Sequence, residues 1–442
     1  MNTIIKSAIG EKMDCLTGVR AIMKDITETL TARSNVINLS AGNPVILPEV
    51  AALWKRCTRE LVSSSSFDEV LCRYGSSQGY EPFIEALVGW FNENYKWDIK
   101  KENVVITPGS QMLYFIAANV FGGYTTDNRF RRIVLPLCPE YTGYEGVVLD
   151  KRMLKTFKPI IEERSSHEFK YLANIGENLV DENTGAVIFS RPCNPTGNIV
   201  SDKEVEIIVS QASSKGVPVF IDSAYAPPFP SMVYDEFENM KPAFGGNIVH
   251  CMSMSKAGMP GERVGIAIGA PEYISSIEAF QSNANIHSSR FGQAIAAKAI
   301  ASGELAEVSK SVIAPYYRAK ADCIKKALHR EMGDVPWSLH KGEGGIFAWL
   351  WLKNLPITDV QLYHDLKAQN LIVVPGSTFF PGFNENWDHK GECIRVSLTA
   401  TEEAIEEGVR VLARVADAVY NAGSQSKIMK NCKSADCHLA LR

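Results

Sequence analysis

The sequence lacks any run of about eighteen apolar residues, the length that a helix needs to cross a bilayer. Its first residues, Met1 to Glu11, are mixed in charge and have no apolar stretch of the kind that forms a signal peptide. These absences predict a protein that has no membrane partner, and we expect it in the cytoplasm.

A large excess of charge of one sign is also missing. The 442 residues hold 46 Lys and Arg against 50 Asp and Glu, a net charge of -4. A general nucleic-acid binder needs a basic surface to displace counterions, so we expect no nucleic acid among the partners. Small anionic ligands fit this charge, since one local cluster of arginines is enough to bind them.

Cysteines paired at short spacing are absent as well. The ten cysteines are scattered from Cys15 to Cys437 without the spacing of a zinc site, and we expect no metal. They are interpreted as reduced thiols of a cytoplasmic protein.

Short apolar runs that alternate with segments of helical period are present. The runs cover residues 103–107, 132–136, 185–190, 217–222 and 247–252, and helices are predicted over 110–121 and 202–215 with start signals at Ser110 and Ser201. Such runs are typical of buried strands in a mainly parallel sheet, and their alternation with helices predicts an α/β layered domain.

The pattern changes after about residue 300. A long helical region at 305–331 is followed by strand signals at 342–350, 371–374 and 393–397 and a final helix over 401–420. This order predicts a second, smaller α+β domain. The predicted division is 1–45, an N-terminal segment associated with the small domain; 46–304, the large domain; 305–421, the small domain; and 422–442, a polar flexible tail.

Polar and aromatic residues stand at or shortly after the end of each of the five apolar runs. They are Gly109-Ser110-Gln111, Pro139-Glu140-Tyr141, Asn194-Pro195-Thr196-Gly197, Asp222-Ser223-Ala224-Tyr225 and Ser253-Met254-Ser255-Lys256. In parallel sheets ligands bind at the carboxyl ends of the strands, so these loops predict one site.

The segment from Ser253 to Gly265 indicates the chemistry of that site. Lys256 can condense with an aldehyde to form a Schiff base, while Ser253, Ser255 and Arg263 suit a phosphate dianion. An aldehyde and a phosphate on one molecule suggest pyridoxal phosphate. Taken alone, the segment is also compatible with an ordinary surface loop.

The order and spacing of several motifs resemble a known family. The motifs are Ala41-Gly42-Asn43-Pro44, Tyr141-Thr142-Gly143-Tyr144, residues 191–198 and 253–265, Trp349-Leu350-Trp351 and Leu355-Pro356-Ile357-Thr358. Over roughly residues 35–420 the chain resembles the aminotransferase class I and II group of fold type I pyridoxal-phosphate enzymes. The resemblance implies a large domain with a mainly parallel seven-stranded sheet between helices, plus a smaller α+β domain.

This resemblance also implies roles around the cofactor ring. Asp222 would face the pyridine nitrogen, where a carboxylate keeps the ring protonated. Tyr225 and Asn194 would donate to the phenolic oxygen, and Tyr141 would stack on the ring. Lys256, Asp222 and Tyr225 are the expected catalytic residues.

For the phosphate, the resemblance implies the backbone amides of Ser110 and Gln111 at a helix N-terminus, completed by Ser253, Ser255 and Arg263. Tyr74 resembles the tyrosine that reaches the phosphate of the neighbouring subunit. That role implies a homodimer with shared active sites.

For the substrate, the resemblance implies that Arg395 binds the α-carboxylate bidentately, with Gly42 and Asn194 nearby. The expected reaction moves an amino group between an α-amino acid and a 2-oxo acid. The cofactor residues equally allow β or γ elimination, substitution or carbon-carbon bond formation. The chain departs from the family pattern at Ser40-Ala41 and at His287-Ser288-Ser289-Arg290, where Arg290 is either a contact for an anionic substrate or a surface arginine.

Overall fold

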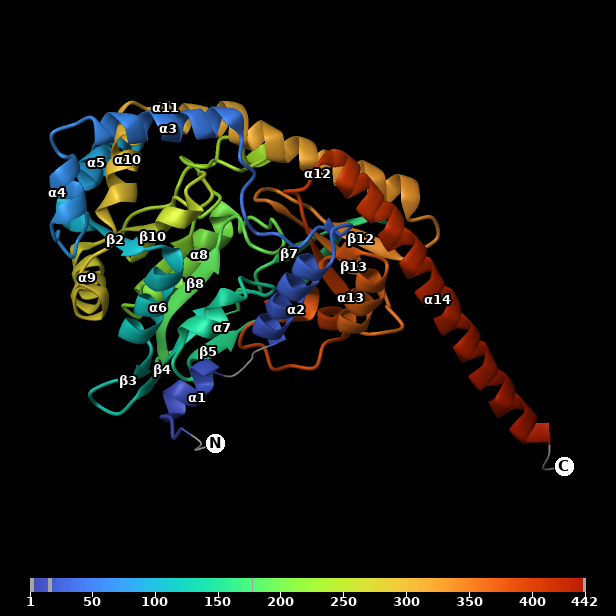
Figure 1. Ribbon diagram of the computed structural model, residues 1–442. Coiled ribbons are helices and arrows are strands. Elements are labelled where there is room, and N and C mark those ends of the chain that lie inside the picture. The colour runs from blue at the N-terminus through green and yellow to red at the C-terminus, as the bar shows by residue number, and fades with distance from the viewer. Residues whose placement is uncertain (1–3, 15–17, 177, 440–442) are drawn as a thin grey trace.

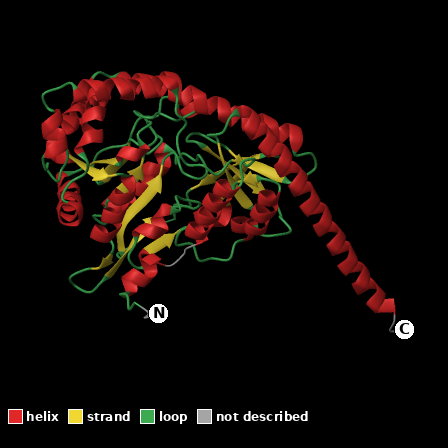
Figure 2. Cartoon of the chain, in the orientation of Figure 1, coloured by secondary structure: helices red, strands yellow, loops and turns green. Residues whose placement is uncertain are grey.

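The computed structural model describes residues 4–14, 18–176 and 178–439. The two larger sheets lie side by side with helices packed around them, and a long C-terminal helix extends away from the body (Figure 1). Figure 2 shows that the helices surround the strands of both sheets. None of the described helices is long and apolar enough to cross a bilayer.

The larger sheet contains eight strands. In spatial order these are β2 (Val104–Pro108), β11 (Val264–Ile268), β10 (Ile248–Ser253), β9 (Val219–Asp222), β8 (Thr184–Ser190), β4 (Phe130–Leu135) and β3 (Gly123–Tyr124), with β5 (Leu154–Thr156) also paired to β4. The pairings among β5, β4, β8, β9 and β10 are parallel, whereas β11 is antiparallel to both neighbours, as β3 is to β4. The α/β class is confirmed, but the sheet is mixed and has one strand more than the seven expected, because the two-residue strand β3 adds to its edge.

Strand β11 was not predicted from the sequence. It begins at Val264, within the last two residues of the segment from Ser253 to Gly265, and it separates β2 from β10 in the sheet. A β-carbon on Gly265 would lie 2.6 Å from the backbone nitrogen of Ser110. Only glycine allows this approach, which places the end of this segment against the start of helix α6 (Ser110–Phe121).

Helices pack on both faces of this sheet (Figures 1 and 2). They are α3 (Pro48–Val62), α4 (Phe67–Cys72), α5 (Glu81–Tyr95), α6 (Ser110–Phe121), α7 (Gly143–Val147), α8 (Asp202–Ser213), α9 (Pro271–Asn285) and α10 (Arg290–Ala301). Helix α6 has the predicted bounds. Helix α8 begins as predicted because Ser201 and Glu204 form a capping box, and it ends two residues earlier than predicted.

The smaller sheet has the order β15 (Val374–Pro375), β16 (Cys393–Ser397), β13 (Phe347–Leu352), β12 (Trp337–His340), β7 (Glu168–Leu172) and β6 (Ile160–Ser165). The helices α11 (Glu304–Val308), α12 (Ala314–Glu331), α13 (Asp359–Ala368) and α14 (Glu402–Leu439) belong to the same half of the chain, and a π-helical turn at Ser309–Ile313 joins α11 to α12. Residues 342–346, predicted as the start of a strand, form a loop. Gly345 has φ +81 there, and a β-carbon on Gly344 would lie 2.5 Å from the carbonyl oxygen of Met232.

The hairpin of β6 and β7 crosses from one half of the chain to the other. It lies in sequence within the predicted large domain, yet β7 pairs in parallel with β12 of the smaller sheet. The hairpin is therefore structurally part of the small sheet. Sequence pattern gave no signal for this placement, because the pairing partner lies more than a hundred residues away in the chain.

The N-terminal segment packs on the small domain over part of its length. Helix α2 (Gly18–Ala32) contacts α13 through Asp25, which accepts hydrogen bonds from Lys367 and Tyr363, each at 2.6 Å. Strand β1 (Ile37–Asn38) pairs with β14 (Leu371–Ile372). Helix α1 (Ala8–Asp14) instead lies beside the large domain, where Lys12 donates to the carbonyl of Val148.

The final helix is longer than predicted. Its end was expected at Tyr420, followed by a flexible tail, but α14 has helical backbone to Leu439. The physical reason lies in its composition, since no proline follows residue 402 and alanine, lysine, leucine and glutamine favour helix.

The capping box of α8 provides a test of this local structure. Ser201→Ala removes the side-chain acceptor for the backbone N–H of Glu204, and the free energy of unfolding should fall by about 1 kcal/mol in urea denaturation. Ser213→Ala, at the exposed end of the same helix, is the control and should leave the stability unchanged. Equal effects of the two substitutions would contradict the assignment of the cap.

Candidate active site

Lys256 lies in the turn after β10, at the carboxyl edge of the large sheet. Its Nζ donates a hydrogen bond of 2.7 Å to the carbonyl of Gly42 and lies 5.7 Å from the centre of the Tyr225 ring. Burial lowers the pKa of Lys256 to about 8, and the positive charges of Arg395 and Arg263 add to this effect, while Asp222 opposes it. A larger share of the amine is therefore the reactive free base near neutral pH.

Asp222 is the last residue of β9 and is buried. Its Oδ2 accepts a hydrogen bond of 3.0 Å from the hydroxyl of Tyr144, and its Oδ1 accepts one of 3.1 Å from the backbone of Ala224. Burial raises the pKa of Asp222, and these donors and the charge of Lys256 oppose the rise. Tyr144 belongs to the motif at residues 141–144, but no role was predicted for it.

The start of α6 meets Arg263 in a cradle suited to a phosphate. Gly109 has φ +82, and a β-carbon there would lie 2.2 Å from Nη2 of Arg263, so the guanidinium reaches the helix N-terminus that Ser110 and Gln111 begin. Arg263 Nη1 donates to the hydroxyl of Ser255 at 3.3 Å.

Ser253 Oγ accepts from the backbone of Ser255 at 3.2 Å, so its hydroxyl hydrogen stays available. Free helix amides, a guanidinium and two hydroxyls are the donors that a phosphate dianion requires, and the residues present fit this part of pyridoxal phosphate.

Arg395, on β16, brings the small sheet to the site. Its Nη1 donates to Asn194 Oδ1 at 3.0 Å and its Nη2 donates to the carbonyl of Ser40 at 2.9 Å. The guanidinium carbon lies 4.0 Å from the Phe347 ring centre and 4.9 Å from that of Phe379. Burial lowers the pKa of Arg395 to about 10.

The Nε of Arg395 is buried without a protein partner. A buried cation with an unused donor is costly unless an anion joins it, so this side chain fits a substrate carboxylate.

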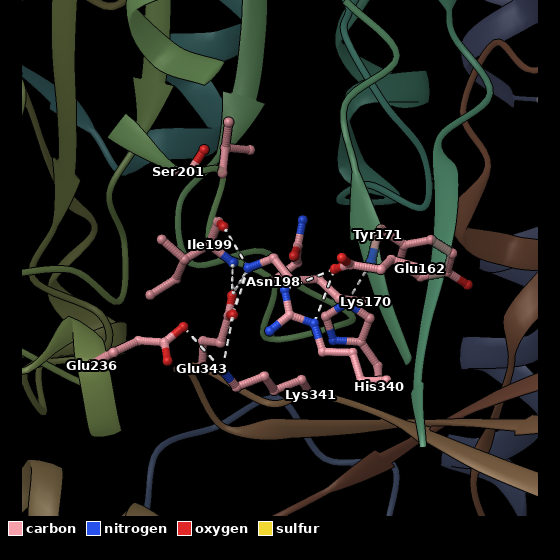
Figure 3. Close-up of polar contacts among 12 residues, drawn as sticks. Glu162, Lys170, Tyr171, Asn198, Ile199, Ser201, Glu236, His340, Lys341 and Glu343 are labelled. Carbon is pink, nitrogen blue, oxygen red and sulfur yellow. Dashed lines mark hydrogen bonds and ion pairs between the residues drawn. The ribbon is translucent and has the colours of Figure 1, made fainter. Parts of the chain in front are cut away.

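A buried ion pair supports the loop that carries Asn194 (Figure 3). Lys170 on β7 pairs with Glu343, and their side chains are 5% and 2% exposed. Both also bind Ile199, since Lys170 Nζ donates to its carbonyl at 3.1 Å and Glu343 Oε2 accepts from its N–H at 2.9 Å. The pair thus ties residues 193–199 to the small sheet. Sequence reasoning missed both residues, and the only signal was a charged residue inside a strand pattern.

Tyr141 and Tyr225 lie on the same part of the site. The ring centre of Tyr141 is 5.5 Å from that of Tyr144, and buried Tyr225 has its ring centre 6.4 Å from that of Phe347. Burial raises the pKa of both hydroxyls, so they are hydrogen-bond donors at neutral pH.

Tyr74 is not brought to this site within the chain. It is 83% exposed and has an edge contact with His287 at 5.9 Å between ring centres. Arg290 holds the same loop, since its Nη1 donates to the backbone carbonyls of Glu69 at 3.0 Å and of Arg73 at 3.4 Å. Within its own chain Arg290 therefore supports this loop, while a contact with an anionic substrate stays a prediction.

The fold and the convergence of these groups define a pyridoxal-phosphate-dependent transferase of fold type I. Residues 34–412 match the family described as aminotransferase class I and II, and the chain belongs to that family.

The chain is 35% identical over 407 residues to the valine–pyruvate aminotransferase of Escherichia coli strain K12, covering 92% of this chain and 97% of that protein. Among solved structures, a putative amino-acid aminotransferase from Psychrobacter arcticum 273-4 has a TM-score of 0.90 and 34% identity, with 95% of this chain and 100% of that one covered. The valine–pyruvate aminotransferase of Salmonella typhimurium LT2 has a TM-score of 0.83 and 32% identity, with 91% and 100% covered.

The close approach of Gly265 to Ser110 predicts a specific sensitivity of the phosphate cradle. Gly265→Ala places a β-carbon 2.5 Å from the backbone carbon of Gly109, so α6 must shift and the cofactor should bind about tenfold more weakly. The dissociation constant is measured by titrating the apoprotein with pyridoxal phosphate. Gly261→Ala is the control, because a β-carbon there meets nothing within 4 Å. An unchanged affinity in Gly265→Ala would show that the cradle does not depend on this contact.

Proposed function

We propose that this aminotransferase moves an amino group between an α-amino acid of the valine type and a 2-oxo acid of the pyruvate type, in the cytoplasm. The observation that carries the proposal is the meeting of Lys256 and Asp222 of the large sheet with Arg395 of the small sheet, beside a phosphate cradle. The substrates follow the relative that is 35% identical over 92% of the chain.

The residues proposed to hold the cofactor divide by the part of the molecule that they bind. Ser110, Gln111, Ser253, Ser255 and Arg263 bind the phosphate. Asp222 holds the proton of the ring nitrogen, Asn194 and Tyr225 donate to the phenolic oxygen, and Tyr141 covers one face of the ring. When bound, pyridoxal phosphate supplies an electron sink for negative charge at the α-carbon.

Lys256 is the proposed general base. Its amine, with a pKa of about 8, accepts the proton of the substrate α-carbon at Nζ and later donates it again, so one nitrogen serves both proton transfers. The hydrogen bond to the carbonyl of Gly42 holds this nitrogen at the N-terminal segment that lines the site.

Arg395 is proposed to orient the substrate. Its Nε, which has no protein partner, donates to the α-carboxylate beside Asn194, so the α-hydrogen is directed to Lys256. Because the cation is already buried, binding of the carboxylate restores the charge balance of the site.

We further propose that the protein is a homodimer in which Tyr74 of each chain reaches the phosphate in the site of the other. The support is the 83% exposure of Tyr74 and the way in which Arg290 fixes its loop. A large aromatic side chain on a loop that a half-buried arginine holds is suited to a contact with a second copy.

Incubation of the holoenzyme with a panel of amino acids and 2-oxo acids tests the reaction. Valine and pyruvate should give alanine and the oxo acid of valine in equal amounts by mass spectrometry. Lys256→Ala should lose both this activity and the visible absorption of lysine-bound cofactor. Release of ammonia or a new carbon skeleton would instead show elimination or carbon-carbon bond formation, and a wild-type protein that takes up no pyridoxal phosphate would contradict the proposal entirely.

Mixed dimers test the role of Tyr74. When Tyr74→Phe and Lys256→Ala are on the same chain, opposite a wild-type chain, the one functional lysine faces the altered residue, and cofactor affinity should fall about tenfold. When the two substitutions are on different chains, one intact site remains and its affinity should be normal. Tyr124→Phe, at another exposed tyrosine, is the control in the same pairings. Equal affinity in both arrangements would show that Tyr74 does not act across an interface.

A further inference from the structure

Glu140 is a buried carboxyl group beside the site to which the family resemblance assigned no role. It is 0% exposed and lies in the loop after β4. Its Oε1 accepts a hydrogen bond of 2.7 Å from the backbone of Ser190, and its Oε2 accepts one of 2.9 Å from the backbone of Tyr141. Glu140 therefore fixes the backbone of the tyrosine proposed to cover the cofactor ring.

The same carboxyl group begins a chain of contacts that ends at Asp222. Ser190 Oγ lies 2.7 Å from Glu140 Oε2 and 3.1 Å from the hydroxyl oxygen of Tyr144. That hydroxyl donates to Asp222 Oδ2 at 3.0 Å. Two buried carboxyl groups are thus joined by two hydroxyl groups.

The hydrogen-bonded chain from Glu140 to Asp222 requires a fixed number of hydrogens. Its three contacts need three hydrogens, and the hydroxyls of Ser190 and Tyr144 supply two of them. The third must come from one of the two carboxyl groups. If Asp222 is ionised, as a partner of a protonated ring nitrogen must be, a continuous chain requires the third hydrogen on Glu140.

The electrostatic surroundings are consistent with a proton on Glu140. Burial raises the pKa of Glu140 to about 7, and the charge of Asp222 adds to the rise, against the hydrogen bonds from Ser190 and Tyr141. The other titratable groups facing Glu140 are the thiols of Cys138 and Cys193 and the hydroxyl of Tyr144. Burial raises the pKa of each of these, so they are neutral when Glu140 titrates.

We propose that Glu140 is a positioning residue that sets the basicity of Asp222 through Ser190 and Tyr144. With its proton, Glu140 donates along the chain toward Asp222 and weakens that carboxylate as a base. When Glu140 ionises, the chain loses a hydrogen and a second negative charge faces Asp222, which then holds the ring proton of the cofactor more tightly. The inference rests on the proposed function, in which Asp222 faces the ring nitrogen.

Pyridoxamine phosphate is the probe that tests this coupling, because it binds without a bond to Lys256. Glu140→Gln can donate to Ser190 but cannot ionise, so it resembles the protonated wild type at every pH. The dissociation constant of pyridoxamine phosphate from Glu140→Gln, divided by that from wild type, should rise about fivefold as the pH passes upward through the titration midpoint of Glu140. Taking the ratio removes the titration of the ligand itself.

Asp359→Asn is the matched control. Asp359 is a carboxyl group that is 2% exposed and accepts a backbone hydrogen bond from Ser377 at 2.7 Å, but it has no hydrogen bond to the chain that leads to Asp222. The dissociation constant of this variant for pyridoxamine phosphate, divided by that of wild type, should be the same at every pH. A flat ratio for Glu140→Gln as well, in proteins that bind pyridoxamine phosphate, would overturn the coupling and leave the proposed function intact. A wild-type protein that binds no pyridoxamine phosphate would overturn the proposed function and, with it, the coupling.

Ser190→Ala gives a second test that keeps the carboxyl group of Glu140. It interrupts the hydrogen-bonded chain but preserves the negative charge of Glu140. Its dissociation constant divided by that of wild type should therefore also rise with pH, but by less than for Glu140→Gln. In Glu140→Gln one backbone N–H loses its acceptor, which costs stability. If that variant does not fold, Ser190→Ala alone tests the coupling. No change in the ratio for Ser190→Ala would overturn the path through Ser190 and Tyr144.

Discussion

The active site gathers more positive than negative charge in a buried space, and the rest of the molecule is arranged around this imbalance. Arg395 and Arg263 lie close enough to Lys256 to help lower its pKa to about 8, while Asp222 is the single carboxylate that opposes them. Cations held apart from water in this way favour anions, and the phosphate and carboxylate groups of a cofactor and substrate restore the balance. The same repulsion keeps Lys256 reactive.

Holding these charges together requires contacts between the two sheets. Arg395 comes from the small sheet and Asp222 from the large one, so their distance depends on how the halves of the chain are joined. The β6–β7 hairpin and the Lys170–Glu343 pair make one connection (Figure 3). The backbone N–H of Glu140, which donates a hydrogen bond of 2.9 Å to the carbonyl of Phe379, makes another. Buried ion pairs are costly to break by removing one partner, so such contacts favour one relative placement of the sheets.

Prediction from sequence succeeded where local pattern and residue chemistry agree. Helix α6 has its predicted bounds, and β16 covers its predicted residues, because apolar periodicity and terminal signals coincide there. Prediction failed for β11, whose five residues follow a loop motif, and for the β6–β7 hairpin, whose strands find their partners far along the chain. It also ended α14 too early, because polarity was taken as a sign of a tail although the residues favour helix.

The sequence by itself determined the chemistry: a lysine among serines, an arginine, an aspartate after an apolar run and an asparagine before proline are recognisable one by one and in order. Only the tertiary structure decided which groups support them. It brought Tyr144, Ser190 and Glu140 into one hydrogen-bonded chain that ends at Asp222, placed Glu343 against Ile199 in the loop that carries Asn194, and left Tyr74 exposed. The reason is physical, since hydrogen bonds and charge interactions depend on distance in space, whereas a motif records only distance along the chain.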